Sequence, residues 1–561
     1  MFKKAMAAIL AASMSLTVGI VTPNLSDTAS AASNTRYMEA LDRGLVAMKT
    51  DSGIYLSWRL LGTEAYSTSF YVYKNNSVIA TVSDSTNYHD TSGTVSDTYS
   101  VAPTSGSKCT GVKAFASGDN FIDIPLAPLD DYIAPDGTAY EYEVRDGSVG
   151  DLDGDGEYEL VVKREANRQH AGAAGFNHMY MEAYKLDGTV RWRIDMGQNM
   201  RAMTEFSFLV YDFNNDGVAE IACKTAPGTK DGTGQYVTAA SQNSSIKSAD
   251  NTADYHDSNG YILTGPEYYT LFDGRNGEAL DTINYPIPRG TNSANDLNKI
   301  WGDNYGHRAE KCMSAVAYLD GVNPNIVLWR GIYFGKSGYG AGRTALAGIS
   351  VNSSNRLVLG NQFDTWSGQT GYTSGNEQYI GQGNHNLTVG DVDGDGYDEI
   401  LSGGLCIDHT ISKALWCSYR GHGDALHLGN YDPTNGSLEY FTVQEEAGTA
   451  YDGTVLDYGM TVYDAKDGTQ KLHIGDDGDT GRGVMANIGT GGYYQVWGSD
   501  FYQCNGNSSF TQSTVQPSTY NFRIFWDGDL YDELWDATNP AKTYTPNIFD
   551  YNSSTGAIES I

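Results

Sequence analysis

The chain has 561 residues and carries 36 basic against 69 acidic side chains, a formal net charge of −33 at pH 7. Because this balance offers no basic face for phosphate groups, we expect no nucleic acid as a partner. Glycine is very common (65), tyrosine is frequent (40) and proline is scarce (14), which favours many short strands joined by tight turns.

The N-terminal segment has the pattern of a secretion signal. Lys3 and Lys4 precede an apolar run, and Ala29-Ser30-Ala31 resembles a signal-peptidase site. We therefore expect residues 1–31 to be a signal peptide and the mature protein to be secreted to the extracellular space. A transmembrane anchor is the alternative, but the cleavage signal follows the apolar run directly. We expect no membrane partner.

Residues 35–125 alternate apolar and polar positions at the strand period, in phrases such as "GIYLSWRL" and "TSFYVYKNNSVIATV". The alternation predicts a small β-sandwich that resembles a fibronectin type III module of about 90 residues. We expect Trp58, Tyr71 and Tyr99 to be its core aromatic residues.

Residues 126–561 repeat one phrase, an apolar strand followed by a polar loop. The loop begins at Asp151, Asp212, Tyr318, Asp391, Asn430, Asn487 and near Trp526. Between these loops, residues 183–194, 270–283 and 460–474 read as hairpins turned by Asp-Gly or Asn-Gly. The pattern predicts an all-β chain of seven units, the last one incomplete. Units of about four short strands favour a β-propeller.

Three of these loops are strongly acidic. An EF-hand needs a carboxylate at position twelve, where Val162 and Ser402 stand instead. The acid falls at position nine, where a strand begins, so we expect structural Ca²⁺ sites of another kind. The expected metal ligands are Asp151, Asp153, Asp155, Glu159, Asp212, Asn214, Asp216, Glu220, Asp391, Asp393, Asp395 and Glu399.

The six cysteines show no CxxC spacing, which argues against a zinc site. In an exported protein Cys406 and Cys417 could form a disulfide.

Polar, histidine-rich stretches lie immediately before the apolar start of several units, at 381–391, 419–429 and 475–486, and a further polar stretch lies at 143–151. In a propeller they would meet around one mouth of the central channel. Histidine with aspartate can bind a metal, and arginine binds carboxylates. The candidate residues are Arg145, Asp146, His385, His422, Asp424 and Arg482.

The phrases "GNHNLTVGDVDGDGYDEI", "GHGDALHLG", "TGRGV", "WDGDLYDEL" and "VGDLDGDGEYEL" resemble the rhamnogalacturonan lyases of polysaccharide lyase family eleven, from about residue 36 to 535. The resemblance implies an eight-bladed, calcium-rich β-propeller that cleaves the galacturonate–rhamnose backbone of pectin by β-elimination. It also implies that Asp146, His385, His422 and Asp424 surround an active-site cation. Arg482 would then face the uronate as the catalytic residue.

The chain departs from that family at three loop positions, where substrate contacts belong. The family usually has Asn-Asp at Arg145-Asp146, Lys-Trp-Asp-Pro-Ser-Asn at 163–168 and Arg-Gly-Tyr-Tyr-Thr-Arg at 330–335. We expect Arg145, Glu165, His385 and His422 to contact the substrate. With seven units visible against eight blades, the propeller is expected to be incomplete at its C-terminal end.

The leading hypothesis is a secreted, calcium-dependent lyase that acts on pectic polysaccharide as a monomer. The alternative is a non-catalytic or altered-specificity carbohydrate-binding relative, because of the substituted loops. A protein-binding adhesion propeller would share the acidic loops, but the histidines at 385, 422 and 427 speak against it.

Overall fold

The computed structural model describes residues 36–39, 42–61, 64–65, 67–115, 122–135, 137–166, 177–201, 206–290, 294–333, 342–446, 448–449, 451, 453, 455–529, 531–538 and 545–561. The chain divides into two units, Met1–Ser33 and Asn34–Ile561. The expected signal peptide and positions 167, 168, 334 and 335 lie outside the described residues. No helix in the described part of the chain is long and apolar enough to span a membrane.

The N-terminal region forms two three-stranded sheets that enclose one apolar cluster. Trp58 and Tyr99 lie in this cluster, as predicted. The prediction for Tyr71 is wrong, because Phe70 and Val72 occupy the inward positions of their strand and Tyr71 is 36% exposed. The sheets are built from β1 (Val46–Thr50), β2 (Gly53–Ser57) and β5 (Asn87–Asp90), and from β4 (Ser77–Val82), β3 (Phe70–Lys74) and β6 (Tyr99–Pro103).

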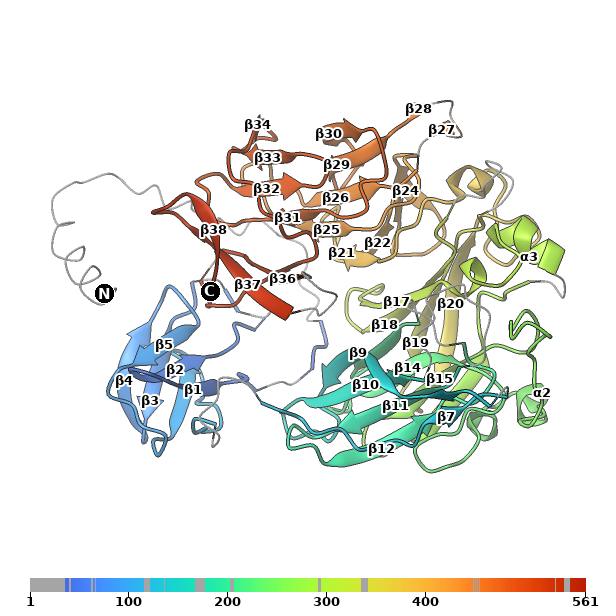
Figure 1. Cartoon of the computed structure of the whole chain (residues 1–561), viewed down its shortest axis with the longest axis horizontal. Coiled ribbons are helices and arrows are strands. Elements are labelled where there is room, and N and C mark those ends of the chain that lie inside the picture. Colours follow the sequence, from blue (N-terminus) through green and yellow to red (C-terminus); the bar gives the residue numbers. More distant parts are fainter. Residues whose placement is uncertain are drawn as a thin grey trace. The chain divides into compact units, whose positions relative to one another are not determined.

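Seven four-stranded antiparallel sheets follow within the described residues, which confirms the all-β prediction (Figure 1). In sequence order their strands are β9 (Glu143–Gly150), β10 (Glu159–Glu165), β11 (Met179–Tyr184), β12 (Val190–Asp195); β13 (Phe208–Tyr211), β14 (Glu220–Thr225), β15 (Tyr268–Asp273), β16 (Ala279–Asn284); β17 (Cys312–Ala317), β18 (Asn325–Arg330), β19 (Ala345–Val351), β20 (Leu357–Asp364); β21 (Thr388–Gly390), β22 (Glu399–Ser402), β23 (Leu405–Ile407), β24 (Ala414–Cys417); β25 (Leu426–Gly429), β26 (Glu439–Gln444), β29 (Tyr458–Asp464), β30 (Gln470–Asp476); β31 (Val484–Ala486), β32 (Tyr494–Trp497), β33 (Phe501–Cys504), β34 (Phe510–Gln512); and β35 (Phe522–Ile524), β36 (Glu533–Thr538), β37 (Thr545–Asn552), β38 (Ala557–Ser560).

Among the described residues, short elements alone interrupt this series. They are the hairpins β7 (Tyr132–Ile133) with β8 (Ala139–Tyr140) and β27 (Gly448–Thr449) with β28 (Val455–Leu456), the helices α2 (Ser244–Lys247) and α3 (Ala294–Trp301), and the 3₁₀ turns Val237–Ala240, Arg308–Glu310 and Asn376–Tyr379.

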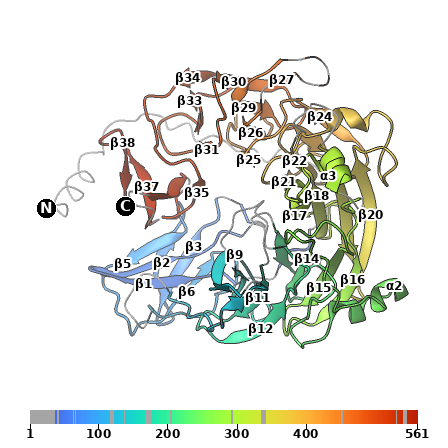
Figure 2. The same cartoon turned by 45° about the vertical axis from the view of Figure 1, so that its right-hand side comes forward.

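Successive sheets pack face to face, and the first strand of each sheet contacts the first strand of the next, from β9 to β35 (Figure 2). An apolar cluster lies between each pair of successive sheets. The side chains of a strand alternate between its two faces. In β18, for example, Ile326 and Leu328 pack toward the second sheet, whereas Val327 and Trp329 pack toward the fourth. The second strands β10, β14, β18, β22, β26 and β32 are therefore buried at nearly every position.

The seven predicted loop positions directly follow the seven first strands, and the three predicted hairpins are β11–β12, β15–β16 and β29–β30. The seventh unit was predicted to be incomplete, which is wrong, since it has all four strands β35 to β38. Strands β37 and β38 contain no fully buried residue, although Phe549, Tyr551 and Ile558 pack against the cluster between the sixth and seventh sheets.

Cys406 and Cys417 do not form a disulfide, contrary to the possibility raised by the sequence. They lie on the neighbouring strands β23 and β24, but Cys406 pairs with Trp416 and Cys417 pairs with Leu405. This offset of one residue turns the two sulfurs to opposite faces of the sheet.

Candidate functional site

The predicted site residues lie in the segments that lead into the first strands of the fourth, fifth and sixth sheets. His385 precedes β21, His422 and Asp424 precede β25, and Arg482 precedes β31. Backbone bonds tie these segments together, because the amide of His385 donates to the carbonyl of Gly423 over 3.3 Å. The amide of Glu445, just after β26, donates to the carbonyl of His422 over 3.0 Å.

Four side chains converge at this place, namely His385, His422, Asp424 and Glu445, and one potential ligand atom of each lies within 4.8 Å of the others. The Nε2 atom of His422 is 2.9 Å from Oε2 of Glu445 and 3.6 Å from Oδ1 of Asp424. The Nε2 atom of His385 is 3.3 Å from the same Asp424 oxygen. Two imidazoles and two carboxylates thus face one small volume.

His422 is fully buried, and its hydrogen bonds determine which ring nitrogen faces the carboxylates. Nδ1 lies 3.0 Å from the carbonyl oxygen of Gly383, so Nδ1 must carry a proton and donate it. Nε2 is left facing Asp424 and Glu445. Burial lowers the pKa of His422, but the proximity of these two carboxylates outweighs it and raises the pKa to about 9.

The cluster contains orphaned polar atoms, which is the observation that fits a bound cation. Nε2 of His422, Oδ1 of Asp424 and Oε2 of Glu445 are buried, and none makes a hydrogen bond of acceptable geometry. Leaving such atoms unpaired is costly, and a cation would satisfy all three together. Oxygen ligands suit Ca²⁺, and imidazole nitrogens suit transition metals as well.

His385 is held neutral, whereas His422 would release its Nε2 proton when a cation binds, because a metal ligand must be a neutral imidazole. Burial lowers its pKa to about 4, and the neighbouring positive charges of His422 and Lys311 act in the same direction. Its Nε2 atom also lies 2.9 Å from the hydroxyl of Tyr333. The Tyr333 ring in turn packs against the ring of His422, with centroids 4.3 Å apart.

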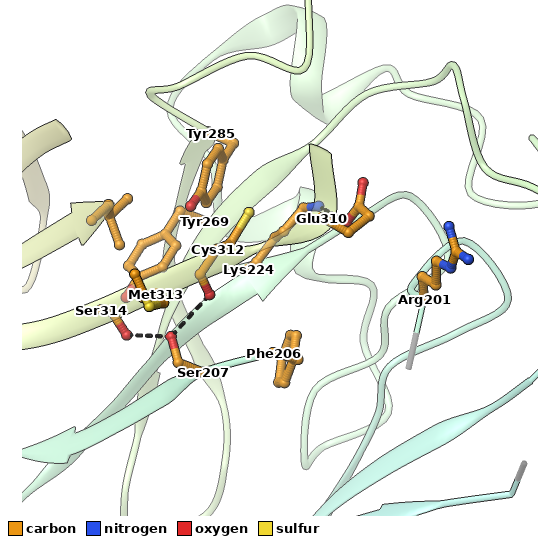
Figure 3. A pocket seen from close by; sticks show the side chains of 11 residues that line it. Arg201, Phe206, Ser207, Lys224, Tyr269, Tyr285, Glu310, Cys312, Met313 and Ser314 are labelled. Atoms are coloured by element: carbon orange, nitrogen blue, oxygen red, sulfur yellow. Dashed lines mark hydrogen bonds and ion pairs between the residues drawn. The ribbon is translucent and has the colours of Figure 1, made fainter. Parts of the chain in front are cut away.

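A buried ion network supports the segment that leads to Tyr333. Arg330 bonds both oxygens of Glu267 at 2.9 and 3.0 Å, and Lys224 bridges Glu267 and Glu310. Lys224, Glu310 and Arg201 line a cavity of about 10 Å³, and Figure 3 shows Lys224 next to Glu310. A cavity of this volume holds about one water molecule, so it is too small for a sugar. The network therefore stabilises the scaffold of the site.

Arg482 lies beside the cluster and faces solvent. Its Nη1 atom is 3.1 Å from Oδ2 of Asp424, and its side chain is 55% exposed. The guanidinium can therefore reach a ligand in solution while it remains anchored to the cluster.

Arg145, Asp146 and Glu165 lie on the first sheet, within β9 and β10. Arg145 is 3.8 Å from Glu165, and Glu165 is buried and 3.1 Å from Lys163. Among the described residues, Asp146 is not part of the histidine-containing group; its side chain accepts a bond from the amide of Gly147. His427 also lies outside this group, within β25.

The acidic loops gather carboxylates as the sequence suggested, and the position-nine acids begin β10, β14 and β22. Three groups of ligand atoms form, Asp151–Asp153–Glu159, Asp212–Asp216–Glu220 and Asp391–Asp393–Asp395–Glu399. Asp155 is not part of the first group, and the Asn214 amide donates to Glu220 over 2.6 Å. A further group, Asp527–Asp529–Glu533, was not predicted as a metal site.

Sequence reasoning missed Glu445, Tyr333 and Lys311. Glu445 follows a second strand and stands in no histidine-rich phrase, so only the pairing of β25 with β26 brings it to the site. Tyr333 lies within residues 330–335, a segment for which only a departure from the family pattern was noted. Lys311 is buried near the site, and burial lowers its pKa to about 8 against the raising effect of Asp424 and Glu445.

Comparisons with known proteins give consistent matches over most of the chain. Residues 121–561 match the family described as the C-terminal domain of rhamnogalacturonan lyase family 11, and residues 36–115 match the β-sheet domain of rhamnogalacturonan I lyases. The rhamnogalacturonan exolyase YesX of Bacillus subtilis (strain 168) is 39% identical over 545 residues, which cover 94% of this chain and 82% of the relative. The rhamnogalacturonan endolyase YesW of the same organism is 39% identical over 515 residues, covering 90% and 76%.

Solved structures agree with these sequence matches. The crystal structure of the exotype lyase YesX superposes with a TM-score of 0.80 at 37% identity and covers 94% of this chain and 83% of that chain. The rhamnogalacturonan lyase PL11 of Bacillus licheniformis gives 0.79 at 38% identity, with the same coverage.

Proposed function

The chain belongs to rhamnogalacturonan lyase family 11 and is a polysaccharide lyase. From this we propose that it cleaves the rhamnogalacturonan I backbone of pectin by β-elimination at galacturonate. The observation that carries the proposal is the group of His385, His422, Asp424 and Glu445 with Arg482 beside it. This group offers a cation site and a guanidinium to one carboxylate ligand.

Elimination needs removal of the C5 hydrogen of galacturonate, which is acidic only when the adjacent carboxylate is neutralised. The four clustered side chains would hold a divalent cation, which supplies this neutralisation when bound. Nδ1 of His422 donates a hydrogen bond to the carbonyl oxygen of Gly383, and this bond fixes the orientation of the ring. Arg482 would bind the uronate through two parallel hydrogen bonds, for which its planar guanidinium is suited.

Arg145 remains a proposed substrate-binding residue, and Glu165 is proposed to act through it. Arg145 has a half-exposed side chain that a uronate can reach. Glu165 is buried between Arg145 and Lys163, so we assign it the role of holding the arginine.

We propose that the seven sheets form a β-propeller and that the N-terminal sandwich is fibronectin type III-like. Support comes from the succession of first strands in contact and from the apolar layer between every two successive sheets. A radial arrangement of sheets brings the segments before the first strands to a common rim, where the candidate site residues lie.

Secretion, structural calcium in the acidic loops and a monomeric state also belong to this proposal. Calcium would offset part of the net charge of −33. The residue pattern at positions 1–31 supports export.

The test is an assay with rhamnogalacturonan and calcium that follows the ultraviolet absorbance of the unsaturated product. We expect the protein to produce the signal and Arg482→Ala to lose at least about a hundredfold in kcat/KM, since about 3 kcal/mol of charged hydrogen bonding to the reacting uronate disappears. Arg420→Ala is the matched control and should keep its activity, because Arg420 pairs with Asp457 at 2.9 Å and not with the cluster. Binding of the polymer without any product would instead support the non-catalytic alternative.

A further inference from the structure

We propose that Tyr333 is a positioning residue whose hydroxyl exchanges hydrogen-bond partners when a divalent cation binds. Without a cation, the hydroxyl bonds Nε2 of His385. When that nitrogen binds the cation, the hydroxyl is released toward the substrate. The inference rests on the proposed cation site and adds a residue with a defined role to it.

The contacts of His385 provide the first step. Nε2 is 2.9 Å from the Tyr333 hydroxyl and 3.3 Å from Oδ1 of Asp424, so it is the ring nitrogen turned toward the clustered ligand atoms. In the neutral tautomer that carries its proton on Nδ1, Nε2 has one lone pair, which can accept the hydroxyl proton or bind a cation but not both. Cation binding through this nitrogen must therefore break the bond from Tyr333.

The surroundings of the Tyr333 ring provide the second step. The guanidinium carbon of Arg308 lies 4.5 Å from the ring centroid, the ammonium of Lys311 lies 5.8 Å from it, and the His422 ring packs at 4.3 Å. Cation–π and ring contacts of this kind fix the ring in place. After the exchange, the hydroxyl therefore stays beside the cluster and needs a new acceptor, which the oxygen atoms of a bound sugar supply.

The exchange has a measurable consequence for affinity. In Tyr333→Phe no hydroxyl competes for Nε2, so the cation should bind about fivefold more tightly, the factor that corresponds to one ordinary hydrogen bond. A hydroxyl that acted as a cation ligand would produce the opposite change, and a bystander would produce none.

Co²⁺ is a suitable probe, because its visible absorption responds to imidazole ligands, and the ligand groups of the acidic loops consist of carboxylates alone. We expect the Co²⁺ titration of Tyr333→Phe to reach half-saturation at about one fifth of the concentration that the unmutated protein needs. Tyr372→Phe, which removes a hydroxyl bonded to Glu377 outside the site, should titrate like the unmutated protein. His422→Gln should lose the absorption band, which assigns the band to this cluster. Unchanged or weaker Co²⁺ binding by Tyr333→Phe would overturn the exchange.

A second readout tests the release toward substrate. With the cation at saturation, Tyr333→Phe should lower kcat about tenfold and leave KM within about twofold, since the freed hydroxyl acts on the bound sugar. An unchanged kcat would refute the release. The Co²⁺ titrations need no substrate, so they decide the exchange even if the protein proves inactive on rhamnogalacturonan and the proposed function fails.

Discussion

His422 shows how one buried side chain acquires its role from its neighbours. The carbonyl of Gly383 takes the Nδ1 proton, and the opposite nitrogen is turned to Asp424 and Glu445. His427, three residues after Asp424, is partly buried, and among the described residues no carboxylate forms an ion pair with it. Burial lowers the pKa of His427 to about 4, with a smaller contribution from the charge of Arg523. Two histidines of the same strand region therefore shift in opposite directions.

His427 should make stability depend on pH. Its folded pKa of about 4 lies below the ordinary value of 6.5, so between these values the unfolded chain binds a proton that the folded protein refuses. The contribution of His427 to the free energy of unfolding is complete above pH 6.5 and is lost as the pH falls toward 4. The full loss amounts to about 3 kcal/mol. We expect His427→Gln to flatten this part of the dependence, measured as urea unfolding free energies at pH 7, 5.5 and 4. Carboxylates titrate alike in both proteins, so identical pH slopes would contradict the assignment.

At the scale of the elements, the acidic loops share one construction but differ in how their charge is balanced. Five second strands begin with a buried glutamate whose Oε2 accepts a backbone N–H of the preceding loop: Glu159, Glu220, Glu399, Glu439 and Glu533. In the loop at Glu439, the ammonium of Lys471 lies 3.3 Å from Oε1 and takes the place of a cation.

The loops at Asp153 and Asp395 show the same difference. Arg191 and Lys185 lie 2.5 and 3.1 Å from Asp153. Among the described residues, no lysine or arginine pairs with the carboxylates of Asp391, Asp393, Asp395 or Glu399, and Lys466 reaches only the backbone oxygen of Asp393. Burial, with nearby aspartates, raises the pKa of Glu399 to about 8. The loop at 391–399 therefore needs an external cation more than the loop at 151–159 does.

Calcium should consequently stabilise the protein through the loop at 391–399 more than through the loop at 151–159. We expect addition of Ca²⁺ after chelation to raise the Tm by several degrees, because the ligand binds the folded state. Asp395→Asn should remove a clear part of this rise, and Asp153→Asn, the matched control, should keep it within about 1 °C. Equal losses in the two variants, or a Tm that chelation leaves unchanged, would show that the charge balance does not decide occupancy.

At the scale of the whole molecule, the sheets are stabilised by the apolar layers between them. The sixth and seventh sheets enclose Val484, Trp497 and Leu534. The opposite face of the seventh sheet carries the cross-strand pair Phe522 and Trp535, which are 57% and 43% exposed. Two tryptophans on neighbouring sheets therefore differ in what surrounds them.

This difference predicts unequal costs of truncation. Trp497→Ala should destabilise the protein by about 3–5 kcal/mol, since a fully buried ring is lost from a packed layer and its bond to the Thr519 carbonyl is broken. Trp535→Ala, the control on the outer face, should cost about 1 kcal/mol, mainly through the contact with Phe522. Urea unfolding monitored by circular dichroism measures both, and similar costs would contradict the layered core.

Local patterns in the sequence were sufficient for the all-β class, the seven repeated units and their loops and hairpins. Strand alternation and Asp-Gly turns act over a few residues, so they can be read without knowledge of the rest of the chain. The glutamates at position nine of the acidic loops could be predicted from the sequence for the same reason. Tyr71, Cys406 and Cys417 were misjudged because a shift of one residue, invisible in composition, decides which face of a strand a side chain occupies.

Only the tertiary structure decided which polar residues meet and which charges are already paired. Glu445 and Tyr333 join His385, His422 and Asp424 because three successive sheets pack at fixed distances, and no spacing along the chain encodes that packing. Lys185 and Arg191 reach Asp153 from the hairpin β11–β12. This contact distinguishes the acidic loop at 151–159 from the loop at 391–399, whose sequence is nearly the same. The sequence by itself therefore determined the repeated element and its turns. The packing of the sheets determined the chemistry at their ends, because that chemistry depends on distances between residues far apart in the chain.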